Sequence, residues 1–179
     1  IAYAMENFVT ENSVFFAGNL DICYKNIPNT VPSGKYAYVP IVREGKRNRN
    51  PFLTTLQKNI LPVYKIGGRT QFLSLYYMAV LVNKFFGLIP SRIWAVHGSL
   101  FCFNVLAIKK GGDIFNSNSF LYAEELEFAS YMEYNHVTLK ESSIEIEHYA
   151  HASTSDIVAN RKYFLKIWWF SYRNWLKRW

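Results

Sequence analysis

Short apolar runs suited to β-strands alternate along this chain with segments of helical period, and this alternation constrains the fold more than any other feature. Strand-like runs are predicted for residues 13–17, for 36–42 and for two stretches of 92–108. Period-two alternation predicts a further strand through Ile144, Ile146 and His148. Helical spacing covers residues 121–134 and the tail of the chain. The sequence therefore predicts an α/β architecture with helices packed on a sheet.

Only about four strands are visible in this pattern, which is few for a self-contained parallel sheet. The chain is therefore expected to be the second half of a larger fold. Residues 70–90 are the most apolar region, but Asn83 and Lys84 interrupt the run, and a membrane-spanning helix needs about 20 apolar residues. A buried or interfacial helix, ended by Gly87 and Pro90, is predicted there.

Composition excludes general disorder, since 50% of the 179 residues are apolar and 18% are charged. The net charge of +7 is unevenly distributed, with six Lys or Arg and no acid in residues 157–179. The acids gather instead between Glu124 and Glu147. This distribution predicts that the tail meets an anionic surface while the acids do local chemistry. Four basic residues in the loop 43–51 are either solvated or face a phosphate: Arg43, Lys46, Arg47 and Arg49.

Cys23 and Cys102 lie far apart and fit no metal-binding spacing, which favours a reducing compartment. No signal-peptide pattern opens the sequence, which begins with Ile1. The expected location is the cytoplasm, with peripheral contact at the inner face of the membrane.

Asp21 follows the first predicted strand in the sequence Gly-Asn-Leu-Asp. A carboxylate at the carboxyl edge of an α/β sheet lies where ligands bind, and it suits a Mg²⁺ or Mn²⁺ ion that bridges a nucleoside diphosphate. The alternative is that Asp21 caps the next turn or helix.

Three acids, Glu124, Glu125 and Glu127, follow the apolar Phe-Leu-Tyr of residues 120–122. A carboxylate in a dry pocket is suited to act as a general base. The alternative is that the acids stabilise a helix N-terminus, by about 0.3–1 kcal/mol each. Further along, His148 and His151 precede a Ser-Thr cluster, where an imidazole either contacts a metal or phosphate or serves a structural role.

The order of these pieces resembles the family 2 glycosyltransferases, in particular the bacterial rhamnosyltransferase-like branch. "GNLDI" is similar to the Asn-Pro-Asp-like motif after an apolar strand, and "YVPIVREGKRNRNP" to the strand and Gly turn that follow it. "VHGSLFCFNVLAIKKGGDIFN" resembles the Gly-containing strand and Ile-Gly-Gly-Phe-Asp-Glu turn, and "SFLYAEELEF" the Phe-Phe-Leu-Tyr-Gly-Glu-Asp signature. "HYAHAST" and a basic aromatic helix with Arg173-Asn174 complete the order.

The resemblance covers most of the chain from about Ser13, and "FLYAEE" is its most specific part. Leu20 replaces the usual Pro, Asn116 and Ser117 replace an Asp-Glu pair, and Glu125 stands where Asp is common. The nucleotide-binding part that precedes the Asn-Pro-Asp region in the family is not in this sequence.

This resemblance implies the C-terminal portion of a GT-A (nucleotide-diphospho-sugar transferase) fold, with a mixed sheet flanked by helices. Residues 1–156 would form the acceptor side of the catalytic domain, and 157–179 a basic aromatic amphipathic helix. The implied metal ligands are Asp21 and His148, with Mg²⁺ or Mn²⁺ as the cofactor. The implied general base is Glu125, with Glu124 as second choice. The implied reaction transfers a sugar with inversion from a nucleotide-sugar donor to a polysaccharide or lipid-linked glycan.

The tail predicts a membrane contact, because eight apolar residues lie on one face of a helix with basic residues mostly opposite: Phe164, Leu165, Trp168, Trp169, Tyr172, Trp175, Leu176 and Trp179. The alternative is an amphipathic helix packed on the sheet. A rival function is a non-catalytic relative, or a basic aromatic module that binds an anionic polymer or a membrane surface. Nucleic acid is not expected as a partner, since no nucleic-acid-binding motif occurs.

Overall fold

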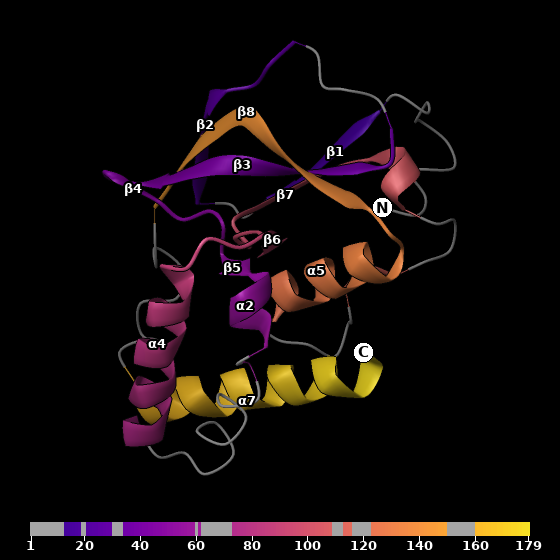
Figure 1. Cartoon of the computed structure of the whole chain (residues 1–179). Helices are drawn as coiled ribbons and strands as arrows, with labels where there is room; N and C mark the ends of the chain where they lie inside the picture. Colours follow the sequence, from indigo (N-terminus) through magenta and orange to yellow (C-terminus); the bar gives the residue numbers. More distant parts are fainter. Residues whose placement is uncertain are drawn as a thin grey trace.

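The computed structural model describes residues 13–18, 21–29, 34–59, 61, 73–108, 113–115, 123–149 and 160–179. They form an α/β fold in which a curled mixed sheet lies on one side and the helices on the other (Figure 1). The strands of the main sheet follow the order β1 (Val14–Gly18), β7 (Leu100–Asn104), β3 (Tyr36–Glu44), β8 (Thr138–His148) and β2 (Ile22–Asn26), with β4 (Arg47–Asn48) paired to β3. The remaining elements are β5 (Leu53–Thr54) paired with β6 (Ile93–Ala95), α2 (Thr55–Lys58), α4 (Leu73–Gly87), η1 (Val105–Ala107), α5 (Glu124–Tyr134) and α7 (Arg161–Arg178).

Strand direction decides which residues meet at one edge of the sheet. β3 and β8 are parallel, whereas β7 is antiparallel to both β1 and β3, and β2 is antiparallel to β8. Strands β1, β3 and β8 therefore end at the same edge, where β2 and β7 begin. Ligands bind in α/β folds beyond the carboxyl ends of parallel strands.

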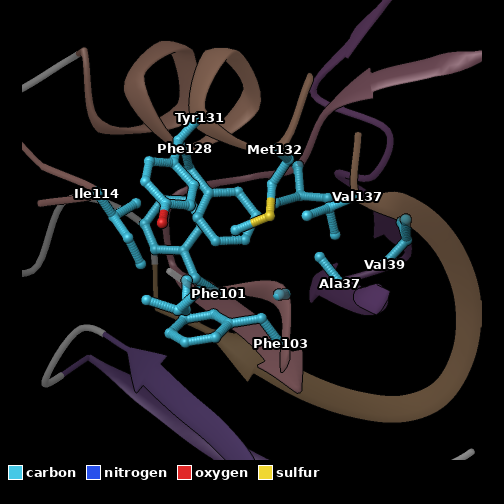
Figure 2. Close-up of a cluster of buried hydrophobic side chains, with 12 residues drawn as sticks. Ala37, Val39, Phe101, Phe103, Ile114, Phe128, Tyr131, Met132 and Val137 are labelled. Atoms are coloured by element: carbon cyan, nitrogen blue, oxygen red, sulfur yellow. The ribbon is translucent and has the colours of Figure 1, made fainter. Parts of the chain in front are cut away.

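The two faces of the sheet carry separate apolar clusters. In β7, Phe101 and Phe103 point to the helical side, whereas Leu100 and Cys102 point to the opposite side, as the period of two requires. Figure 2 shows Phe128 of α5 against Phe101 and Phe103. Its ring centroid lies 4.6 Å from that of Phe101. This contact fixes α5 on the sheet.

The aromatic stripe of the tail faces the protein. Tyr172 and Trp175 are buried in a cluster that joins α7 to α5, β5 and β6, and Trp168 and Trp169 pack against that cluster. The indole Nε1–H of Trp175 donates to Ser130 Oγ of α5 at 2.9 Å. α7 is therefore a packed amphipathic helix, and its outer side exposes four basic residues, Lys162, Lys166, Arg173 and Lys177.

The predicted mixed α/β architecture is confirmed, and so are the strands at β1, β3, β6, β7 and β8 and the helices at α4, α5 and α7. The expectation of about four strands was too low, since the described residues form eight. The missed strands are either two residues long, as β4 and β5 are, or largely exposed, as β2 is, so they lack an apolar pattern. Among the described helices, none combines the length and the apolar character needed to cross a membrane.

Candidate functional site

Four side chains that could bind a cation gather at the edge where the parallel strands end. Glu44 and His148 are the last residues of the parallel strands β3 and β8. Asp21 immediately precedes β2, whose first residue pairs with His148. His97 lies in the turn just before β7. Strand pairing thus joins residues up to 127 positions apart.

The two nitrogens of His148 face two different carboxylates. Its Nδ1 lies 2.8 Å from Glu44 Oε1, and its Nε2 lies 3.6 Å from Asp21 Oδ1. A carboxylate only accepts hydrogen bonds, so Glu44 holds the ring proton on Nδ1. In the neutral ring, the lone pair of Nε2 then points toward Asp21.

Glu44 is held by partners on both of its oxygens. Arg49 contacts Oε2, while His148 contacts Oε1. Burial would raise the pKa of Glu44, but hydrogen bonds from Arg49 and His148 outweigh it and lower the pKa below its ordinary value. Glu44 is therefore a charged carboxylate that orients His148, as the outer-shell carboxylates of metal sites do.

Asp21 is different, because its Oδ1 is buried and finds no hydrogen-bond partner among the described residues. Asp21 Oδ1 and His148 Nε2 lie 3.6 Å apart, and a divalent ion between them would satisfy the buried carboxylate oxygen. Ligand atoms about 2.1 Å from a shared ion lie roughly 3–4 Å apart, so the pair fits such an ion. A mixed imidazole and carboxylate set suits Mn²⁺ better than Mg²⁺, which prefers oxygen ligands alone.

His97 completes the cluster. Atoms of Glu44, His97 and His148 lie within 4.8 Å of one another, which is a second arrangement that could hold an ion. However, the backbone N–H of Ser99 donates to His97 Nδ1 at 3.2 Å, which places the proton of the neutral ring on Nε2. Burial, followed by the charge of His148, lowers the pKa of His97 to about 4. His97 is therefore a neutral ring whose Nε2–H can donate a hydrogen bond.

The turn after His97 connects this cluster to Glu125. The backbone N–H of Gly98 donates to Glu125 Oε1 at 3.2 Å. A Cβ atom at Gly98 would lie 2.5 Å from the same oxygen, so only glycine allows this approach. Burial, together with the charge of Glu124, raises the pKa of Glu125 to about 7. A carboxyl group with this pKa can accept a proton near neutral pH.

The three acids at the start of α5 have three different environments. All lie in the first turn, where they favour the positive end of the helix dipole. Glu124 Oε2 accepts from the Ala123 backbone N–H at 3.0 Å, and Glu127 is buried with Oε2 3.9 Å from Arg178 Nη1. Glu125 is bonded to the 97–99 turn through the backbone N–H of Gly98.

The four basic residues of the loop 43–51 also have different environments. Arg43 pairs with Glu145 at 3.2 Å and Arg49 pairs with Glu44, so these two arginines hold acids of the sheet edge. Lys46 and Arg47 are exposed at the β3–β4 turn, next to the cluster.

Asp21, His148, Glu124 and Glu125 were proposed from the sequence, whereas Glu44 and His97 were not. Glu44 could have been noticed as the only acid between Asp21 and Asp113. His97 could have been noticed in the turn between two apolar strands. Other parts of the predicted motifs lie outside the described residues: Leu20, Asn116, Ser117, Phe120, Leu121, Tyr122 and His151.

No family model matches this chain, and no curated protein or solved structure matches it either.

Proposed function

We propose that this chain belongs to an inverting glycosyltransferase with a GT-A-like fold, which transfers a sugar from a nucleotide-diphosphate donor to a polysaccharide or lipid-linked glycan. The observation that carries the proposal is the meeting of three elements at one sheet edge. The first is the pair Asp21 and His148, which is suited to bind a cation. The second is the β3–β4 turn with Lys46 and Arg47. The third is Glu125, a carboxyl group with a raised pKa.

In the proposed reaction, Glu125 takes the proton from an acceptor hydroxyl as that oxygen bonds to the anomeric carbon. The bond from that carbon to the diphosphate oxygen breaks, and its electron pair leaves with the nucleoside diphosphate. Asp21 and His148 would hold a divalent ion, which when bound neutralises the charge of the diphosphate. Lys46, Arg47 and the Nε2–H of His97 are the chain's own donors for phosphate oxygens in this region.

The rival function, a basic aromatic binding module, is less well supported. It needs exposed aromatic rings interleaved with basic residues. Most of the aromatic stripe of α7 is packed in the core beside α5 instead. We therefore retain the transferase as the single proposal.

The direct test is a transfer assay with a panel of nucleotide sugars and extracted lipid-linked glycan acceptors, with and without Mn²⁺. Release of a nucleoside diphosphate that requires both acceptor and metal is the expected result. Release of none from any donor would contradict the proposal.

Gly98→Ala provides a second test, because the new methyl group forces the carboxyl group of Glu125 to move. Misplacing a catalytic group by about 1 Å costs up to about 100-fold, so we expect a 10- to 100-fold lower rate. The melting temperature should change little, since a flexible side chain can yield. An unchanged rate would show that the position of Glu125 against this turn is irrelevant to turnover.

A further inference from the structure

α4 exposes a stripe of large apolar side chains. Met78, Leu81, Phe85 and Leu88 follow one another at helical spacing from the helix into the turn after it, and Leu81 and Leu88 are 67% and 81% exposed. Tyr77 and Ile89 are each 39% exposed at its margins. A contiguous exposed apolar surface of this kind is typical of a protein or membrane interaction site.

The opposite side of α4 is anchored to the protein. Ala79 is buried, and the side chain of Gln57 in α2 donates from Nε2 to the Asn83 backbone oxygen at 3.0 Å. A Cβ at Gly87 would lie 2.8 Å from that same nitrogen, so the glycine permits a close approach of the two helices. Figure 1 shows α4 at the outer edge of the helical layer. The stripe is thus the outer face of a helix that is already docked.

The charge of the residues around α4 indicates which kind of partner the stripe binds. Residues 45–112 contain no acid and ten basic residues, Lys46, Arg47, Arg49, Lys58, Lys65, Arg69, Lys84, Arg92, Lys109 and Lys110. Lys84 and Arg92 are exposed on and just beyond α4. An apolar stripe with a basic rim complements an anionic surface, whereas a second copy would bring like charges together.

We infer that the α4 stripe, Met78, Leu81, Phe85 and Leu88, seats in the interface of an anionic lipid membrane. Its apolar side chains enter the boundary of the acyl chains, and Lys84 and Arg92 meet the phosphate headgroups. At 15 residues α4 lies in the interface and does not cross it. The tail helix, to which the sequence pattern assigned this contact, buries most of its own stripe. The inference does not depend on the proposed reaction.

The test is co-sedimentation of the full chain with vesicles of phosphatidylcholine alone or with phosphatidylglycerol added. We expect binding to the anionic vesicles that weakens as salt is raised. Leu81→Glu combined with Phe85→Glu should weaken vesicle binding by about 100-fold, since two apolar side chains that enter the membrane are lost. Leu106→Glu, at an exposed apolar residue of η1, is the matched control and should bind as the wild type does.

Circular dichroism and thermal melting should show that the double variant folds. Absence of wild-type binding to anionic vesicles, or equal binding by the double variant, would overturn the inference. Sedimentation equilibrium tests whether a second copy of the chain covers the stripe instead. A wild-type dimer that Leu81→Glu with Phe85→Glu turns into a monomer, without vesicle binding, would assign the stripe to a second copy and overturn the inference as well.

Discussion

Replacing Glu125 by Gln is expected to slow sugar transfer by about 10²–10⁴-fold, because that is what a general base contributes. The amide keeps the shape of the side chain and can still accept the Gly98 hydrogen bond, but it cannot take a proton. The fold should therefore persist. The measurement is the rate of nucleoside diphosphate release in the Mn²⁺-containing transfer assay.

Glu124→Gln is the matched control, since its carboxylate bonds the Ala123 backbone N–H at the start of the same helix. Its rate should fall by less than about tenfold, as expected for a lost helix-terminus charge. Wild-type turnover by Glu125→Gln, or equal losses in both variants, would contradict the assignment of the base.

The raised pKa of Glu125 adds a pH signature to the same variant. Between the ordinary value of 4.5 and about 7, the native carboxyl group retains a proton that the unfolded one has released. Stability therefore falls as pH rises through this window and remains lower above it. Glu125→Gln should be roughly 1–3 kcal/mol more stable than the wild type at pH 8, and nearly equal to it at pH 4.

The second large effect concerns the metal. Asp21→Ala and His148→Ala should each weaken Mn²⁺ binding by more than about 100-fold, and Glu44→Gln by about 10- to 100-fold, as expected for a residue that orients a ligand. Calorimetric titration with Mn²⁺ alone measures all three. The reason for the grading is that both oxygens of Glu44 already have partners, whereas Asp21 Oδ1 has none among the described residues.

His136→Asn is the control for loss of an imidazole, because His136 is exposed beyond the end of α5 and Asn tolerates its positive φ of 55°. It should bind Mn²⁺ as the wild type does. If Glu44→Gln costs more than Asp21→Ala, the ion belongs among Glu44, His97 and His148 instead. If the wild type does not bind Mn²⁺, Asp21 and His148 do not form a metal site and the prediction is wrong.

Local patterns in the sequence predicted where helices and strands form better than they predicted what covers the apolar face of each helix. Short apolar runs were sufficient to predict β1 and β3, and period-two alternation was sufficient for β8, where Ile144 and Ile146 are buried on one face. Helical spacing showed that α7 has an apolar stripe but not what covers it, and the structure packs that stripe on α5. For α4, the apolar run of residues 70–90 favoured burial as much as an interface, yet Met78, Leu81, Phe85 and Leu88 lie exposed.

The candidate site was only half predictable for a related reason. Asp21, Glu125 and His148 stand in motifs that can be recognised one at a time. Glu44 joins them only because β3 runs parallel to β8, a pairing about 100 residues apart that no local pattern encodes. His97 joins them because β7 starts at the edge where β1, β3 and β8 end.

Titration of nucleoside diphosphates into the folded chain, with and without Mn²⁺, measures whether this sheet edge binds a donor diphosphate through a metal ion. We expect at least one diphosphate to bind in the presence of Mn²⁺, to bind weakly or not at all without it, and to fail to bind to Asp21→Ala. Binding that ignores both Mn²⁺ and Asp21→Ala, or no binding by any diphosphate, would contradict a metal-assisted transferase site at this sheet edge.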